Sequence, residues 1–256
     1  MVSARLNPAA AVLMEEMTSK EVGDALRNGK DTVLVSVGSF EQHGPHLPLG
    51  TDTYIGDAYA VQIARELGNA LVAPSIRPGL SHPHIGFPGT ITLRPETMIR
   101  IMWDYAESLQ RHGFKNIVFI SSHRGNNNTM RVARSKLSFE WGKAKILVIE
   151  RLPKYAQGNT PSDSESGHAG KRETSVMQFI KPDFVKIDRA VRSIPPPMDY
   201  EDIVTGPLER ISPSGVLGDA TKANADLGKK DFETICKGAA SEIRNRIATL
   251  KMAYDR

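Results

Sequence analysis

The chain has 256 residues, of which 40% are hydrophobic and 24% are charged, and its formal net charge is +4 at pH 7. This length is sufficient for one large domain with a substantial core, and we expect residues 1–256 to form a single domain. The sequence has no apolar run long enough to span a bilayer and no signal-peptide layout at its N-terminus. We therefore expect a cytoplasmic protein with no membrane partner.

The cysteine count and the basic residues narrow the possible chemistry. Cys236 is the single cysteine, which excludes an intrachain disulfide and a cysteine-based zinc cage. Basic residues gather between positions 124 and 145, but no aromatic-interleaved or arginine-rich motif accompanies them. A solvated helix face explains this cluster, so we expect no nucleic-acid partner.

The first predicted elements are a strand and the helix that follows it. Residues 31–37 include a β-branched run that is typical of a buried strand and ends at Gly38. After a loop, Thr51, Asp52 and Thr53 offer capping oxygens to a helical pattern that closes near Gly68. Asp52 is therefore expected at or beside the N-terminus of this helix.

A second strand and a long loop are expected next. Residues 70–76 have the pattern of a strand, and residues 78–90 are rich in turn-forming and polar residues. Pro95 then begins a helix whose apolar stripe can cover one face of a sheet. Because long loops without periodicity often carry function, Ser81 and His84 are candidates for contact with a substrate.

The third strand, over residues 116–120, is the clearest in the sequence and leads directly into a loop with His123. A helix and a strand over 145–149 follow, so strands and helices alternate through the first 150 residues. This alternation predicts an α/β fold with a mainly parallel sheet that is covered on both sides. Ligands bind at the carboxyl ends of such strands, where we expect the Glu41, Ser81 and His123 loops to meet.

The remaining part of the chain contributes two predicted helices. A polar, turn-rich stretch over 155–167 precedes the first of them, over residues 169–180. Residues 195–213 read as irregular covering structure, and residues 222–251 have helical composition.

The stretch 39–52 contains two carboxylates and two imidazoles and predicts half of a metal site. Glu41 and His43 are two residues apart, so on an extended segment their side chains leave the same face. Asp52 returns after a turn that is rich in glycine and proline. Oxygen and nitrogen ligands of this kind suit Zn, Mn or Fe.

Each of these residues also has a simpler interpretation. Glu41 can form a salt bridge within its loop, the histidines can be ordinary hydrogen-bonded residues, and Asp52 can cap a helix. Their joint spacing, together with His123 after the third strand, favours a metal site over these separate roles.

His168 and Glu173 form another candidate pair. They are five residues apart at the start of a predicted helix, where a loop imidazole and a first-turn carboxylate can lie on the same side. Alternatively, Glu173 is an acid that stabilises the N-terminus of this helix, and His168 is an ordinary loop residue.

These motifs resemble the creatininase family of metal-dependent amidohydrolases, and the resemblance extends over roughly residues 30–230. That family has a three-layer α/β/α sandwich fold and typically assembles into hexamers from dimers, so the resemblance implies a homo-oligomer that binds a small-molecule substrate. The matching residues are Glu41-Gln42-His43-Gly44-Pro45-His46-Leu47-Pro48-Leu49-Gly50-Thr51-Asp52, Phe87-Pro88-Gly89-Thr90, His123 with Gly125-Asn126, and His168-Ala169-Gly170 with Glu173-Thr174-Ser175.

The resemblance implies a dinuclear centre with two divalent ions per subunit, which are Zn, Mn or Fe. Glu41 and His123 would hold one metal, His43 would hold the other, and Asp52 would bridge them. The two metals would activate a water molecule for attack on a carbonyl carbon.

One metal ligand of creatininase has no counterpart at its usual position. Creatininase has a glutamate two residues after the matching histidine, and this chain has Gly125 there. We assign the missing carboxylate to Glu173 as a hypothesis, and we expect His168 to act catalytically by carrying a proton to the leaving nitrogen.

The substrate is expected to differ from creatinine. Creatininase has an aromatic residue where this chain has Arg124, and it has tryptophans near the His168 motif, where this chain has none. An arginine suits an anionic or polyhydroxylated substrate, which Arg124 and Ser81 would orient. We expect hydrolysis of a C–N bond in a cyclic amide, a formamide or a related small molecule. The alternatives are hydrolysis of a C–C bond in a cyclic keto-sugar and a non-catalytic α/β protein that binds small molecules.

Overall fold

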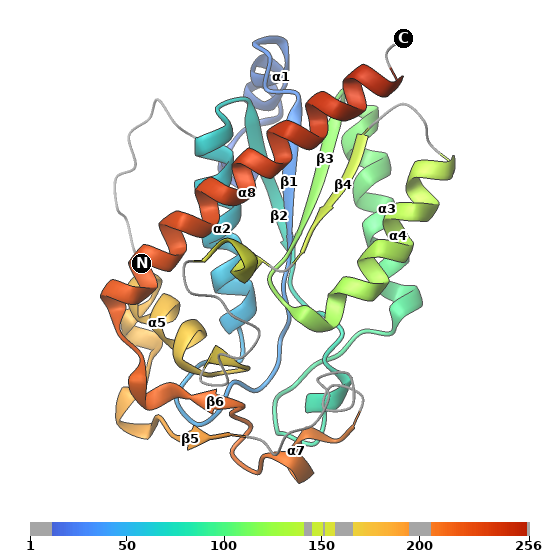
Figure 1. Ribbon diagram of the computed structural model, residues 1–256. Helices are drawn as coiled ribbons and strands as arrows, with labels where there is room; N and C mark the ends of the chain where they lie inside the picture. Colours follow the sequence, from blue (N-terminus) through green and yellow to red (C-terminus); the bar gives the residue numbers. More distant parts are fainter. Residues whose placement is uncertain (1–11, 141–144, 151, 157–165, 195–205, 255–256) are drawn as a thin grey trace.

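The computed structural model describes residues 12–140, 145–150, 152–156, 166–194 and 206–254, and its centre is a parallel sheet (Figure 1). The strands lie in the order β2-β1-β3-β4, and all neighbouring pairs are parallel. Leu34 of β1 lies opposite Val72 of β2 on one side and Val118 of β3 on the other. The bounds are Thr32–Val37 for β1, Ala70–Ile76 for β2, Asn116–Ser121 for β3 and Lys145–Ile149 for β4.

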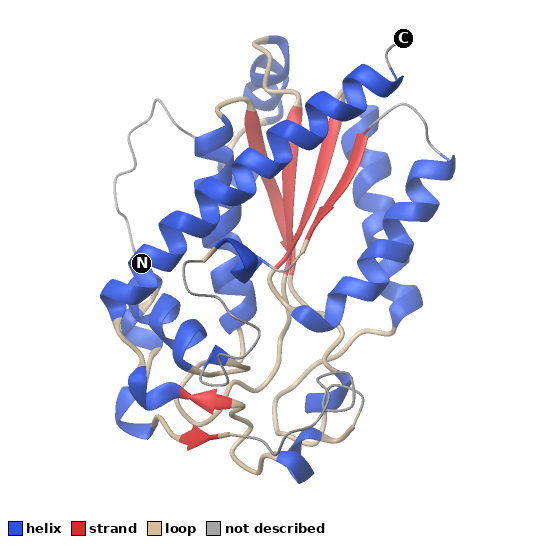
Figure 2. Cartoon of the chain, in the orientation of Figure 1, coloured by secondary structure: helices blue, strands red, loops and turns tan. Residues whose placement is uncertain are grey.

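Helices cover both faces of this sheet, as Figure 2 shows. Three of them pack against one face, and these are α2 (Thr51–Leu67), α5 (Lys171–Ile180) and α8 (Ala225–Tyr254). The other face is covered by α1 (Ser19–Arg27), α3 (Pro95–Arg111) and α4 (Asn127–Glu140). The fold is therefore a three-layer α/β/α sandwich with a parallel central sheet, as the sequence predicted.

The alternation of side chains along the strands builds the two cores. Leu34 and Val118 lie in the core that contains Ile63 of α2. Val33 and Phe119, which are next to them in sequence, lie in the core that contains Met102 of α3. Because successive strand residues point to opposite faces and both faces are buried, the central residues of these strands are mainly apolar. The titratable residues of the site lie in the loops and helix starts that follow the strands.

The predicted strands agree with the structure to within one residue at each end, and the helices differ more. Helix α2 begins at Thr51, so Asp52 lies inside its first turn. Helix α1 was not predicted, although the sequence signal for it exists. Thr18 and Glu21 form a capping box in which each side chain accepts a hydrogen bond from the other residue's backbone N–H.

Smaller elements cover the carboxyl edge of the sheet. Strands β5 (Arg192–Ser193) and β6 (Gly218–Asp219) pair antiparallel, and α7 (Leu208–Ile211) lies within a region that was predicted to be irregular. The other residues of that region at 195–205, and most of the predicted polar stretch at 157–165, lie outside the described residues. The 3-10 helices are Met14–Glu16, His82–His84, Arg124–Asn126, Leu152–Tyr155, Pro182–Phe184, Ile187–Arg189 and Ala220–Lys222.

Helix α5 is fixed to the rest of the molecule by polar contacts as well as by its apolar face. Arg172 Nε donates a hydrogen bond to Asp231 Oδ2 of α8 at 2.9 Å, and both side chains are buried. His46 Nε2 is 2.8 Å from Thr174 Oγ1, which joins α5 to the loop after β1.

Among the described helices, none is long and apolar enough to cross a membrane.

Candidate metal centre

Loops from all four strands of the central sheet bring acids and imidazoles together at its carboxyl edge. Glu41 and His43 follow β1 and lead to Asp52 in α2, while His123 follows β3. The other residues at this edge are Ser81 and His84 after β2, and His168 and Glu173 after β4 and at the start of α5. The expectation that the Glu41, Ser81 and His123 loops meet is confirmed by the contacts below.

The first group consists of Glu41, Asp52 and His123. His123 Nδ1 lies 3.0 Å from Asp52 Oδ2 and 3.3 Å from Glu41 Oε1. The ring is turned this way because its Nε2 donates a hydrogen bond to the carbonyl oxygen of Leu80 at 3.1 Å. Ser39 Oγ donates a hydrogen bond to Asp52 Oδ2 at 2.6 Å and helps to orient this carboxylate. All three members are buried, and their ligand atoms lie within 4.8 Å of one another.

The second group lies on the other side of Asp52. His43 Nε2 is 3.4 Å from Asp52 Oδ1 and 3.8 Å from Glu173 Oε2. Glu173 Oε2 accepts a hydrogen bond of 2.6 Å from the backbone N–H of Ala169. Ala169 has a φ of 52°, a left-handed conformation that is uncommon outside glycine and that aims this N–H at the carboxylate. The two oxygens of Asp52 thus face two different imidazoles.

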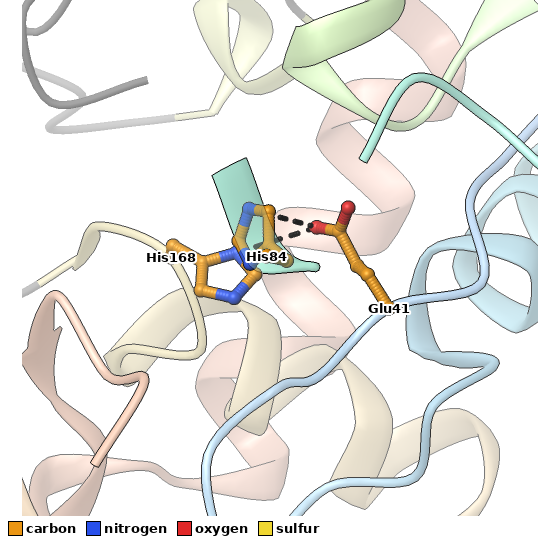
Figure 3. Close-up of side chains that lie close together, drawn as sticks. All are labelled: Glu41, His84 and His168. Carbon is orange, nitrogen blue, oxygen red and sulfur yellow. Dashed lines mark ion pairs between the residues drawn. The ribbon is translucent and has the colours of Figure 1, made fainter. Parts of the chain in front are cut away.

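A third group forms around Glu41, as Figure 3 shows. His84 Nε2 is 3.5 Å from Glu41 Oε1, and His168 Nδ1 is 3.7 Å from the same oxygen. The rings of His84 and His168 lie with their centroids 4.5 Å apart. The sequence pointed to His84 only as a possible substrate contact, and the signal for its position was its place three residues after Ser81 in a turn-rich loop.

Charge at the site is balanced between carboxylates and protonated imidazoles. Burial disfavours the charged form of His43, but Asp52, Glu173 and Glu41 outweigh this effect and raise its pKa to about 10. The pKa of His123 is raised to about 9, because Glu41 and Asp52 again outweigh burial. The same two imidazoles overcome burial at Asp52 and hold the pKa of its carboxyl well below the usual range. In the metal-free protein, protons on His43 and His123 therefore provide the positive charge that cations would provide.

Other groups at the site have the opposite shifts. Burial raises the pKa of Glu41, and it raises that of Glu173 to about 7 against the opposing charge of His43. Burial and the neighbouring positive imidazoles lower the pKa of His84 to about 3 and hold that of His168 well below its usual range. His84 and His168 are therefore neutral at pH 7.

Several buried polar atoms of the site have no hydrogen-bond partner. They are both carboxylate oxygens of Glu41, Nε2 of His43 and Oγ of Ser81. Glu41 and His43 have charged neighbours at 3.3–3.8 Å, but most buried polar atoms in proteins also have a hydrogen-bond partner, so atoms without one are expected where something else binds to them. Carboxylate oxygens and imidazole nitrogens at these separations fit a divalent cation.

The candidate substrate residues differ in exposure. Ser81 is fully buried, with its N–H bonded to Thr92 Oγ1 at 2.9 Å, whereas Arg124 is exposed at the start of a 3-10 helix beside His123. The Glu173 side chain is 30% exposed, while those of Glu41 and His43 are completely buried. The site is therefore open to solvent on the side of Glu173.

Comparison with known proteins identifies the class to which this fold and site belong. The model of the Creatininase family, described as creatinine amidohydrolase, matches residues 15–243. The chain belongs to the creatininase family, and it is a hydrolase of that metal-dependent family.

Three individual similarities illustrate the range of this family. A mycofactocin precursor peptide peptidase of Mycolicibacterium smegmatis is 35% identical over 219 residues, which cover 83% of this chain and 84% of the relative. A creatinine amidohydrolase of Pseudomonas putida is 29% identical over 256 aligned positions, which cover 91% of this chain and 96% of the relative. A solved structure described as creatininase Mn has a TM-score of 0.78 at 26% identity and covers 92% of this chain and 98% of its own.

Gly125 provides a test of how His123 is oriented. A Cβ at this position would lie 2.4 Å from His123 Nε2 and 2.6 Å from the Leu80 carbonyl oxygen, the two atoms of the hydrogen bond that turns the ring. We expect Gly125→Ala to displace the ring and to weaken zinc binding by about 10–100-fold, the usual effect of losing a partner that orients a ligand. The measurement is zinc affinity by competition with a chelator.

Gly23→Ala is the matched control for this substitution. A Cβ at Gly23 in α1 meets only the Arg27 guanidinium at an ordinary 3.5 Å, so zinc affinity should not change. If Gly125→Ala binds zinc as tightly as the control, the His123 orientation does not depend on this glycine.

Proposed function

We propose that Glu41, Asp52 and His123 hold one divalent metal and that His43, Asp52 and Glu173 hold a second. The chain would use this centre to hydrolyse the C–N bond of an amide. The observation that carries the proposal is the placement of Asp52, whose Oδ2 faces His123 at 3.0 Å while its Oδ1 faces His43 at 3.4 Å. A carboxylate in this position has the geometry of a bridging ligand.

The proposed ligands supply only oxygen and nitrogen, which suits Zn, Mn or Fe. When bound, two such ions lower the pKa of a water molecule and polarise a carbonyl group. Glu173 supplies the carboxylate that Gly125 cannot supply, and it approaches His43 from the α5 side at 3.8 Å. Its exposure of 30% also leaves room for a substrate at that edge.

The residues of the chain itself would handle the proton. His168 is neutral at pH 7 because burial and neighbouring imidazoles lower its pKa, so it is able to accept a proton from the attacking water. Its Nδ1 faces Glu41 at 3.7 Å, on the buried side of the site. The proton would then pass from Nδ1 to the nitrogen that leaves when the C–N bond breaks. Ser81 and Arg124 would orient the substrate.

A peptide amide is the substrate class that the similarities favour. The peptidase relative is 35% identical over 83% of this chain, against 29% for the creatinine amidohydrolase. The exposed Arg124 and the open edge at Glu173 suit an extended, charged chain better than an enclosed neutral ring.

A small cyclic amide or a formamide is the second candidate. Its support is the similarity to the creatinine amidohydrolase, which extends over 91% of this chain. The absence of any tryptophan near the His168 motif argues against creatinine itself, because no indole ring in that motif is available to enclose the planar substrate.

The Glu173 assignment predicts a change in metal content. We expect the wild-type protein to hold two metal ions per subunit and Glu173→Ala to hold one, because Glu41, Asp52 and His123 remain. Metal analysis after gel filtration without chelator measures this change. Glu107→Ala, on the exposed side of α3, is the control and should keep both ions. Two ions and full activity in Glu173→Ala would remove Glu173 from the ligand set.

Metal binding should release protons. His43 and His123 have pKa values of about 10 and about 9 in the metal-free protein, so both carry protons at pH 7 that a metal must displace. Because these values are raised, metal affinity should rise with pH by roughly tenfold per unit for each proton released, more steeply below about pH 9 and less steeply from there up to about pH 10.

Calorimetric zinc titration in two buffers of different ionisation enthalpy counts the released protons. Equal heats in the two buffers would contradict this prediction. His112→Gln alters an exposed histidine at the C-terminal end of α3 and should leave the proton count unchanged.

The substrate proposal is tested with zinc, manganese and iron forms of the enzyme. We expect cleavage of short peptides to give a new amine and a new carboxylate, with formamides and lactams cleaved more slowly and creatinine among the poorest substrates. Glu41→Gln, which keeps the size of the side chain and removes its charge, should abolish turnover. Failure of every metal form on every amide would contradict the proposed function.

A further inference from the structure

Gln42 lies between His84 and His168, and the orientation of its amide is fixed by the backbone. Its Oε1 accepts a hydrogen bond from the N–H of Gly44 at 2.9 Å, and its Nε2 donates to the carbonyl oxygen of Gly215 at 3.2 Å. A backbone donor and a backbone acceptor thus identify the oxygen and the nitrogen of this buried amide independently.

The Gln42 amide contacts the backbone at two positions that only glycine occupies without strain. Gly44 and Gly215 have φ values of 66° and 75°. A Cβ at Gly215 would lie 1.9 Å from Gln42 Oε1, so the backbone approaches the amide more closely than any side chain permits. The position of Gln42 is therefore determined by the fold around it.

The fixed amide determines the tautomer of His84. Gln42 Nε2 lies 2.8 Å from His84 Nδ1, and a nitrogen that receives an amide N–H cannot carry a hydrogen of its own. The hydrogen of the neutral ring must therefore be on Nε2, which faces Glu41 Oε1 at 3.5 Å. His84 presents a hydrogen-bond donor to the site.

The same amide determines the role of His168. The two hydrogens of Gln42 Nε2 are used by Gly215 and His84, so His168 Nε2 cannot accept from it although it lies 3.0 Å away. His168 instead donates its Nε2–H to the carbonyl oxygen of Gln42 at 3.0 Å. With its hydrogen held on Nε2, the neutral form of the ring has its lone pair on Nδ1, and this atom faces Glu41 Oε1 at 3.7 Å.

We propose that Gln42 is a positioning residue that makes His84 a hydrogen-bond donor and His168 a proton acceptor at the same reaction site, an inference that rests on the proposed hydrolytic function. Both rings carry their hydrogen on Nε2, but they face the site with opposite edges. The donor edge of His84 suits the substrate carbonyl oxygen as it gains negative charge, so His84 is a further catalytic residue. The acceptor edge of His168 suits the water that loses a proton.

The experiment that tests this proposal reads the tautomers directly. Long-range proton–nitrogen NMR of the zinc-loaded protein with labelled histidines distinguishes protonated from unprotonated ring nitrogens. Assignments come from the variants His84→Phe and His168→Phe. In the wild type we expect both Nε2 atoms to be protonated and both Nδ1 atoms to be bare. A proton on Nδ1 of His84 in the wild-type protein would by itself overturn the proposal.

Gln42→Glu separates a positioning role from a general structural one. A carboxylate cannot donate a hydrogen bond, so a proton should appear on His84 Nδ1, while His168 keeps its bond to the backbone carbonyl of residue 42 and its spectrum is unchanged. Gln62→Glu on α2 is the matched control and should change neither ring. Bare Nδ1 on His84 in Gln42→Glu, or equal shifts of both histidines, would overturn the proposal.

The kinetic counterpart uses His84→Phe with its zinc content confirmed. Loss of a donor to the developing negative charge should lower kcat by about 100–1,000-fold with little change in KM. An unchanged kcat would overturn the catalytic role of His84. The NMR experiment reads the tautomers without any turnover, so it is independent of the hydrolytic activity. If the tautomers are as expected but no amide is cleaved, the proposed function is contradicted, while the role of Gln42 in fixing the two tautomers stands.

Discussion

Negative charge buried at the carboxyl edge of the sheet is the constraint on which the rest of the site depends. Glu41 and Asp52 lie within reach of one imidazole, His123, and both carboxylates are almost completely shielded from water. Such charges persist only beside compensating positive charge. Protons on His43 and His123 provide it in the metal-free protein, and bound cations would provide it in their place. The first turn of α2 assists, because Asp52 lies where the helix dipole favours an anion.

The two halves of the site are held by different means. Glu41, His43 and His123 follow strands β1 and β3, which are buried on both faces. The sheet therefore fixes the points at which the loops that carry these residues begin. Glu173 lies on α5, whose position depends on packing against α8 and on the contacts Arg172 to Asp231 and His46 to Thr174. The Glu173 half therefore depends on tertiary contacts between distant parts of the chain. It is also the half that is open to solvent.

This difference explains what the sequence could and could not predict. The β-branched runs located the strands to within one residue, and the alternation of strands and helices implied that their loops would meet, so the pattern alone could group Glu41, His43, Asp52 and His123. Helix α1 was missed although its capping box is visible at Thr18 and Glu21. The contacts of Gln42 with His84 and His168 could not be predicted. The two histidines follow Gln42 by 42 and 126 positions in the sequence, and one side-chain amide brings them together. No local pattern records such a contact.

Gly125 leaves room for the hydrogen bond that orients His123. In creatininase, which the sequence resembles, a glutamate occupies this position, but here a Cβ would meet His123 Nε2 at 2.4 Å. The hydrogen bond from His123 to Leu80 and a side chain at residue 125 therefore exclude each other in this backbone. The Glu173 carboxylate of α5 lies 3.8 Å from His43 Nε2, and the His123 loop presents the exposed Arg124. Moving one ligand from a loop to a helix, as proposed for Glu173, would preserve the charge of the centre while changing the surface that a substrate meets.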